Sequence, residues 1–201
     1  KSPLTVNQPY EVYGTLTVDG VPITGKNAAY TVKLTKADGT EYKDELSQAW
    51  SEKTTGGVPN NAVGALSGYD GYYAYRVPIY DATDVPLGCP AGATLYIKAF
   101  KNGQPLIIET PNPATLTRGE SGAGDELNIV ARSPGLTSID ITAGATSIQS
   151  GDTLQFTGTG TYEGGATGDV TGTAAWYSTN TGVGSFGATP GLLTGKLVGT
   201  T

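Results

Sequence analysis

Few side chains in this 201-residue sequence are of types that do acid–base, nucleophilic or metal chemistry. The chain contains no histidine and a single cysteine, Cys89. Histidine is the commonest general base and transition-metal ligand, and it is the usual partner that activates a cysteine or serine nucleophile. The acidic residues show no spacing that pairs them for glycoside hydrolysis. We therefore predict a non-catalytic protein that holds no metal ion or cofactor.

Two pairs of acidic residues come nearest to a metal site. Asp81 with Asp84, and Asp125 with Glu126, could supply oxygen ligands to calcium at the end of a β-sandwich. Neither pair belongs to a spaced loop of the EF-hand kind. Carboxylates in surface turns need no partner, so solvated turn acids are the stronger interpretation.

Three further residues could form a covalent cross-link between strands. Lys33, Glu109 and Asn128 are expected on three different strands, where they could in principle make a lysine–asparagine isopeptide bond. The criterion is loose because all three residue types are common. Ordinary surface positions are therefore the stronger interpretation.

Five tyrosines lie close together in the sequence and could stack sugars or contact another subunit. Aromatic side chains are favoured in strands and pair across them, so packing between strands is the stronger interpretation. The five residues are Tyr69, Tyr72, Tyr73, Tyr75 and Tyr80.

Charge and hydropathy exclude several classes of partner. The net charge is −6 and the Lys and Arg residues are scattered, which argues against nucleic acid. No apolar run approaches the ~20 residues that span a bilayer, so we expect no membrane span. The first residues lack the apolar core of a signal peptide, and we expect a processed chain that is secreted or displayed at a cell surface.

Composition and alternation together predict an all-β fold. The 30 Gly, 12 Pro and many Thr favour strands and turns over helices. One helix is predicted at residues 43–53, where Leu46, Ala49 and Trp50 fall on one face, and residues 56–61 are predicted to form an exposed loop. Elsewhere apolar and polar residues alternate with a period of two, which predicts strands at 10–18, 30–35, 72–79, 94–100, 105–109 and 126–131.

A domain boundary is predicted at residues 132–135. There a Pro-Gly turn follows alternating sequence and precedes a new strand. The boundary divides the chain into residues 1–132 and residues 135–201. We expect two tandem β-sandwich domains.

Two motifs of the first domain carry a family resemblance. They are VYGTLTVDGVPI at residues 12–23 and GYDGYYAY at residues 68–75. The domain is similar to the prealbumin-like, or carboxypeptidase-regulatory-like, β-sandwiches. The resemblance implies a β-sandwich fold.

The second domain carries a more specific pattern along its whole length. It resembles the group 2 bacterial immunoglobulin-like family, which occurs in adhesins, surface-layer proteins, polysaccharide-degrading enzymes and phage virions. The resemblance implies a non-catalytic extracellular building block, and the apolar spacing makes Trp176 the expected centre of the core. The motifs that match are SIDIT (138–142), SGDTLQF (150–156), TGTY (159–162), DVT (169–171), AWYSTN (175–180), GLLTG (191–195) and GT (199–200).

The family pattern continues with a final strand that the given sequence does not contain. We expect Leu197, Val198 and Thr201 to border an open sheet edge. Residues 2–8 of a neighbouring subunit, with Leu4 and Val6 as the inward side chains, could fill that edge by strand exchange and join subunits head to tail. A shortened chain is the competing explanation.

These observations predict a structural or adhesive surface protein, with a filament subunit as its specific form. Its expected partners are further copies of itself or other surface proteins. Two alternatives stay open. One is a carbohydrate-binding module of a secreted enzyme, with glycans as partners, and the other is a decoration or tail protein of a phage virion.

Overall fold

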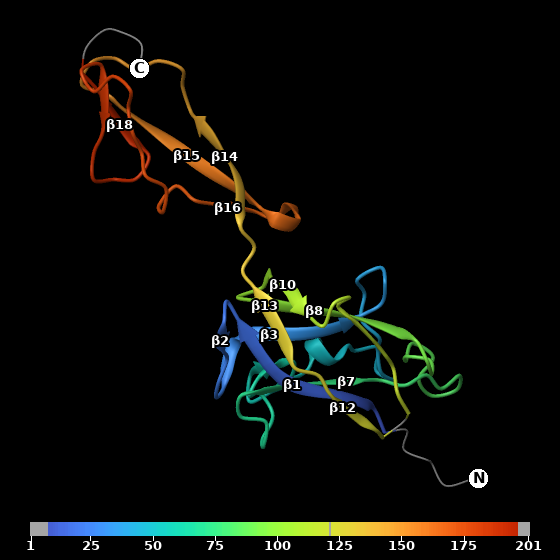
Figure 1. Ribbon diagram of the computed structural model, residues 1–201. Coiled ribbons are helices and arrows are strands. Elements are labelled where there is room, and N and C mark those ends of the chain that lie inside the picture. Colours follow the sequence, from blue (N-terminus) through green and yellow to red (C-terminus); the bar gives the residue numbers. More distant parts are fainter. Residues whose placement is uncertain (1–7, 121, 197–201) are drawn as a thin grey trace. The chain divides into compact units, whose positions relative to one another are not determined.

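The computed structural model describes residues 8–120 and 122–196, which form an almost entirely β protein with several sheets (Figure 1). The all-β class predicted from the sequence is confirmed. The chain divides into two compact units between Ser133 and Pro134. Helical structure in the described residues is limited to two 3₁₀ turns, η1 (Trp50–Glu52) and η2 (Glu163–Gly165). The residues predicted for strand exchange and for the open edge, Leu4, Val6, Leu197, Val198 and Thr201, lie outside the described residues.

The first sheet of unit 1 is centred on β1 (Tyr10–Val18), the most regular strand of the molecule. Every second side chain of β1 is buried, as the two-residue alternation predicted. β1 pairs in parallel with two strands that follow each other along one side, and antiparallel with β7 and β2. The other strands of this sheet are β2 (Val21–Pro22), β7 (Tyr72–Val77), β10 (Ile107–Thr110), β12 (Gly124–Glu126) and β13 (Ile129–Arg132).

The second sheet of unit 1 is built on the long antiparallel pair of β3 (Asn27–Thr35) and β8 (Thr94–Lys101). Its strand order is β11-β8-β3-β6, and β9 adds to β8. The remaining strands are β6 (Ala62–Val63), β9 (Gln104–Pro105) and β11 (Thr115–Thr117), and a separate hairpin joins β4 (Thr54–Thr55) to β5 (Val58–Pro59).

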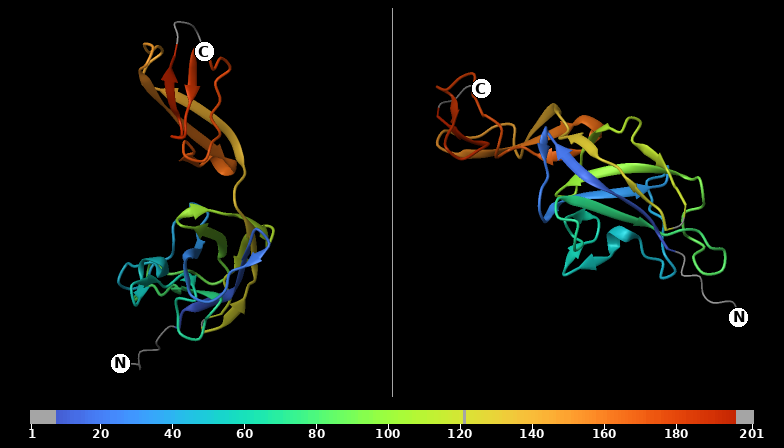
Figure 2. Two further views of the ribbon diagram at one scale, coloured as in Figure 1. Left: turned by 90° about the vertical axis from the view of Figure 1, so that its left-hand side faces the viewer. Right: turned by 60° about the horizontal axis from the view of Figure 1, so that its bottom comes forward.

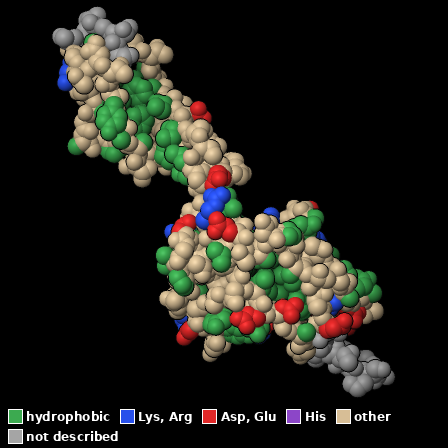
Figure 3. Space-filling model, viewed as in Figure 1, with side chains coloured by type: hydrophobic (Ala, Val, Ile, Leu, Met, Phe, Trp, Pro, Cys, Tyr) green, Lys and Arg blue, Asp and Glu red, His purple; other side chains and the backbone are tan. Residues whose placement is uncertain are grey.

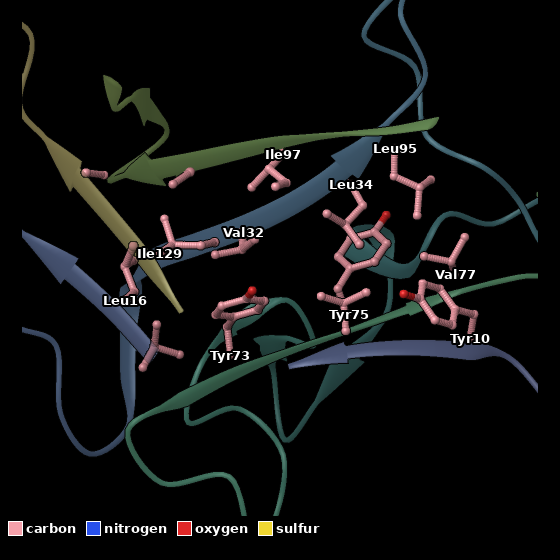
Figure 4. Packing of buried hydrophobic residues seen from close by; sticks show 14 of the residues in the cluster. Tyr10, Leu16, Val32, Leu34, Tyr73, Tyr75, Val77, Leu95, Ile97 and Ile129 are labelled. Carbon is pink, nitrogen blue, oxygen red and sulfur yellow. The ribbon is translucent and has the colours of Figure 1, made fainter. Parts of the chain in front are cut away.

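The core of unit 1 lies between these two sheets, with side chains from both meeting in the middle (Figure 4). Leu16, Val32 and Tyr73 are fully buried there. Burying one such apolar side chain contributes about 1.5–3 kcal/mol, so this interior can stabilise unit 1 by itself. The buried tyrosine keeps its hydroxyl satisfied, because Tyr73 donates a hydrogen bond of 2.6 Å to the carbonyl oxygen of Leu127.

The helix predicted at residues 43–53 is wrong. The carboxylate of Asp44 accepts hydrogen bonds from the backbone N–H groups of Leu46 (2.9 Å) and Gln48 (3.0 Å), and Ser47 has a φ of 59°. This local capping competes with a helical ladder and folds the segment into a tight loop. Leu46, expected on the buried face, is 69% exposed.

The loop predicted at residues 56–61 is exposed only in part. Gly56 and Gly57 form the turn between β4 and β5, with positive φ angles of 60° and 80°. Asn60 and Asn61 that follow are buried, and the Asn61 amide donates a hydrogen bond of 2.9 Å to the carbonyl oxygen of Val32. The side-chain amide thus replaces a missing backbone partner of the second sheet.

The described part of unit 2 contains one five-stranded sheet with the order β14-β15-β18-β17, and β16 pairs with β15. Figures 1 and 2 show the two longest strands of this unit, β14 and β15, running side by side. In their register, Ile139 lies opposite Gly160 and Ile141 lies opposite Gly158. The strands are β14 (Leu136–Ala143), β15 (Thr153–Tyr162), β16 (Thr167–Asp169), β17 (Gly184–Phe186) and β18 (Leu192–Gly195). No helix in the described parts of either unit is long and apolar enough to cross a membrane.

Candidate functional site

The candidate functional site is the apolar face of the unit 2 sheet, which the described residues leave open. All eight residues of β14 are exposed, and its apolar side chains include Ile139 at 45% and Ile141 at 61%. In unit 1, by contrast, apolar side chains at equivalent strand positions are buried under a second sheet. Contiguous apolar surface of this kind is typical of an interaction site.

Two glycines of β15 form the floor of this face. A Cβ placed on Gly160 would lie 2.7 Å from the Leu136 side chain and 2.9 Å from that of Val170. At Gly158 the nearest side-chain atoms, of Val170 and Trp176, would be 3.3 and 3.5 Å away. The missing side chains therefore let their neighbours lie close against the backbone of β15.

Three aromatic rings stand beside this floor and contact each other. The ring centroids of Phe156 and Phe186 are 5.7 Å apart, and Trp176 lies 6.3 Å from the first and 5.4 Å from the second. The Trp176 indole N–H donates a hydrogen bond of 2.9 Å to the carbonyl oxygen of Thr171, which fixes its orientation. Trp176 is partly buried and packs against both phenylalanine rings. Its expected role as the centre of the core stays a prediction.

The rings open into a groove of about 390 Å³. Figure 3 shows hydrophobic side chains gathered on the face of unit 2 that is turned to the viewer. Tyr177, at the rim, is 85% exposed. All nine residues that line the groove are uncharged: Ile141, Phe156, Ala175, Trp176, Tyr177, Ser178, Thr179, Phe186 and Leu193.

The segment 175–179 forms one wall of this groove without belonging to a sheet. Its residues alternate between half-buried and exposed with the two-residue period of a strand. Among the residues that the structure describes, none exchanges a backbone hydrogen bond with the N–H or C=O groups of residues 175–179. The segment has the side-chain pattern of a strand and an open backbone.

The tyrosines proposed as a sugar platform do not form an exposed row. Tyr73 and Tyr75 are buried in the unit 1 core, and burial raises the pKa of both phenols. Tyr69 donates a hydrogen bond of 2.5 Å to Glu11 Oε1 and packs edge-on against Tyr13. Packing between strands, the stronger interpretation of the sequence, describes the buried pair. Tyr72 and Tyr80 remain as separate exposed rings.

The three residues considered for an isopeptide bond each have other partners. Lys33 Nζ lies 3.0 Å from Glu41 Oε2, and Glu109 Oε1 lies 3.4 Å from Arg132 Nε. The Asn128 side-chain oxygen accepts hydrogen bonds from the backbone N–H (2.9 Å) and the hydroxyl (2.7 Å) of Thr15. The structure therefore does not bring these side chains together for a cross-link.

Glu41 is the centre of a polar network of three side-chain donors in unit 1. It accepts hydrogen bonds from Tyr75 (2.5 Å), Ser51 (2.7 Å) and Lys33 (3.0 Å). Burial opposes ionisation of Glu41, but these three donors outweigh it and lower the pKa of the carboxyl. Because β3 and β7 belong to different sheets, the Lys33–Glu41–Tyr75 chain ties the sheets together.

Both acidic pairs considered for calcium have hydrogen-bond partners in the protein, for Asp81 within its own loop and for Asp125 on the neighbouring strand β1. Asp81 accepts hydrogen bonds from Thr83 and from the backbone N–H of Asp84, and Asp125 accepts one from the Tyr10 hydroxyl. The structure shows no group of three or more Cys, Asp or Glu side chains arranged to hold a metal ion within residues 8–120 and 122–196.

Cys89 is fully buried and lies between the sheets of unit 1. Its thiol donates a weak hydrogen bond of 3.6 Å to the carbonyl oxygen of Pro90, and burial raises its pKa. A raised pKa disfavours the thiolate, which is the reactive form of cysteine. Cys89 is therefore a small packing residue of the core.

Comparison with known proteins adds no family assignment, because neither a family model nor a curated protein matches the chain. The assignment of the open face of unit 2 as the candidate functional site therefore rests on its geometry alone. Sequence reasoning had identified Trp176 but not its partner Phe186 or the glycine floor. The alternating glycines in FTGTGTY at residues 156–162 were the signal, since glycine in a strand marks close approach of a neighbour.

Proposed function

We propose that this chain is a non-catalytic structural or adhesive building block of an extracellular surface or filament, and that its copies join by strand addition to unit 2. The observation that carries the proposal is the open apolar face of the unit 2 sheet. The motif order shared with group 2 bacterial immunoglobulin-like domains supports it, because that family occurs in surface and virion proteins.

The physical argument is the free energy of the exposed apolar surface. Burial of such surface stabilises an assembly by roughly 25 cal/mol per Å². A single sheet cannot bury its own apolar face, and stable sheet proteins cover it with a second layer. A strand that supplies part of that layer therefore gains both apolar contact and backbone hydrogen bonds.

Residues 2–8 of a second copy are the proposed donor. Leu4 and Val6 are apolar and alternate with Thr5 and Asn7, which is the pattern of a strand with one buried face. The segment carries no charge between residues 2 and 8, and the lining of the groove is uncharged as well. Donor and acceptor on one chain give a head-to-tail contact, which grows into a polymer if it does not close into a ring.

The test compares the full chain with two matched double variants. Leu4→Asp with Val6→Asp places two charges on the inward positions, while Thr5→Asp with Asn7→Asp places the same charges on the outward positions. Light scattering over a range of concentrations should show polymers for the full chain and the second variant, and a monomer for the first. A full chain that stays monomeric at every concentration would sink the proposal.

A further inference from the structure

Two places where an incoming strand could add to unit 2 are compared. One is the outer edge of β14, the longest edge strand of the described sheet, and the other is the segment 175–179 beside the groove. The choice matters because the two sites bury different surfaces. The following inference rests on the proposed strand addition and identifies its acceptor.

The edge of β14 carries two of the features by which natural sheets discourage strand addition. Asp140 stands in the middle of the strand, and the register with β15 shifts between Leu136 and Ser138. A charge and an irregularity on an edge strand both oppose continuous pairing. β14 is therefore the poorer template.

The segment 175–179 is held at both ends, and between them its backbone has no hydrogen-bond partner among residues 8–120 and 122–196. On one side the Ala174 N–H donates to the Val170 carbonyl oxygen at 2.8 Å. On the other side the Asn180 carbonyl oxygen accepts from Val183 and Gly184, at 3.1 Å each. The Trp176 indole adds a third anchor through Thr171. A segment restrained in this way loses little conformational entropy when a strand pairs with it.

The residues that line the groove determine which side chains an incoming strand must have to fit there. Its lining is uncharged and mostly apolar, and Trp176 and Phe186 leave room for side chains that enter from a strand on the open side. A strand paired with residues 175–179 would direct every second side chain into this space. The fitting partner is an uncharged strand with apolar residues at alternate positions.

We infer that residues 175–179 are the acceptor strand of unit 2, and that residues 4–8 of a second copy pair with them. Leu4 and Val6 enter the aromatic groove, and Thr5 lies on the outer face with Tyr177. Pro3 precedes the paired stretch, so its missing N–H removes no hydrogen bond from the ladder. The contact covers the exposed part of the partly buried Trp176 side chain and completes the backbone hydrogen bonds of its segment.

Disulfide trapping between separate chains tests the acceptor. One chain carries Thr5→Cys, and the other carries either Tyr177→Cys or Asp140→Cys on β14, with the native Cys89 buried in all of them. Facing residues of paired strands come within the distance that a disulfide spans. Under mild oxidation the first pair of chains should give a linked dimer and the second should not.

The outcomes separate the inference from the proposed function. Dimer with Asp140→Cys and none with Tyr177→Cys overturns residues 175–179 as the acceptor while leaving strand addition in place. Dimer in neither mixture, from chains that still polymerise, also overturns the inference. Failure of the unmodified chain to polymerise removes the proposed function itself.

A fluorescence measurement supplies a second readout that does not depend on cysteines. Trp50→Phe leaves Trp176 as the sole tryptophan of the chain. A peptide with the sequence of residues 1–9 is added to this chain after Leu4→Asp and Val6→Asp have blocked its own donor. The Trp176 emission should shift to the blue as the ring leaves water, and a scrambled peptide should leave it unchanged. Equal shifts with both peptides, or no shift with either, overturn the inference.

Discussion

The two units use the same kind of sequence, rich in Thr and Gly, but they differ in how much of it they bury. In unit 1 two sheets enclose a continuous core that includes fully buried Tyr10, Leu16 and Val32. In unit 2 the buried hydrophobic residues of the described part are Val170 and Leu193. The comparison shows that a sequence can carry the alternation typical of strands even where no second layer of the described residues covers the resulting sheet. Unit 1 can thus be stable by itself, whereas unit 2 would gain stability from the strand addition that we propose.

The units also differ in how they hold their acidic side chains. Glu41 and Asp44 of unit 1 are largely buried, and Asp44 forms an ion pair with Lys53. In unit 2 the pKa of Asp169 is lowered by hydrogen bonds from Thr171 within an exposed turn. Lowering the pH should therefore reduce the free energy of unfolding of unit 1 more than that of unit 2, although the core of unit 1 is the better packed.

The largest effect is expected from truncating an apolar side chain in each unit. Leu16→Ala should lower the free energy of unfolding of unit 1 by about 2–5 kcal/mol, because it leaves a cavity in a closed core. Ile141→Ala should change that of unit 2 by less than about 0.5 kcal/mol, because the side chain is mostly exposed. Denaturant unfolding followed by Trp50 in unit 1 and Trp176 in unit 2 measures both. Equal losses would remove the contrast between the units.

The next effect concerns the glycine floor. Gly160→Ala should destabilise unit 2 by about 1–3 kcal/mol, because its Cβ would press on Leu136 and Val170. Gly187→Ala is the matched control, since its Cβ would meet no atom within 4 Å. Thermal unfolding of both variants gives the comparison. A harmless Gly160→Ala would show that the neighbours can move and that the floor is not closely packed.

The two largely buried carboxylates of unit 1, Glu41 and Asp44, predict that the stability of this unit depends on pH. The folded-state pKa values of Glu41 and Asp44 are lowered, so their contribution is full above the unfolded-state values and is lost as the pH falls through the folded ones. Glu41→Gln should cost about 1–3 kcal/mol at neutral pH and flatten the acid limb of the stability curve. Urea midpoints of unit 1 between pH 7 and pH 2 measure it. An unchanged acid limb in the variant would assign the acid sensitivity to other groups.

The smallest effect on stability is expected at the rim of the groove. Tyr177→Ser should change the unfolding free energy of unit 2 by less than about 0.5 kcal/mol, because the ring is 85% exposed. The same change should weaken polymer formation by removing apolar contact beside the incoming strand. Light scattering and thermal unfolding of one preparation separate the two properties. A large loss of stability would show that Tyr177 supports the unit itself.

Much of the fold of unit 1 could be predicted from the sequence, because apolar and polar residues alternate over long runs in its strands. β1 follows the predicted range of residues 10–18, and the turn after it is made by Asp19 and Gly20, both with positive φ angles. The failures come from side chains that bond to the backbone. Asp44 captures the N–H groups that a helix needs, and Asn61 joins a sheet through its amide, neither of which a hydropathy period can reveal.

In unit 2 the sequence indicated part of the groove. The groove lining brings together three of the six apolar residues whose spacing predicted a shared interior, namely Ile141, Phe156 and Trp176. The six residues are Ile139, Ile141, Leu154, Phe156, Trp176 and Leu192. A spacing shows which side chains point the same way, but it does not show whether a second layer covers them. The predicted strand exchange through Leu4 and Val6 stays a prediction.

Amide hydrogen exchange at residues 175–179 tests most directly whether a second copy covers the open face of unit 2. It is measured in the assembled full chain and in the chain with Leu4→Asp and Val6→Asp. We predict slow exchange in the assembled chain, where the backbone groups are paired, and fast exchange in the blocked one. Fast exchange in both, in a preparation that light scattering shows to be polymeric, would contradict this structure of the contact.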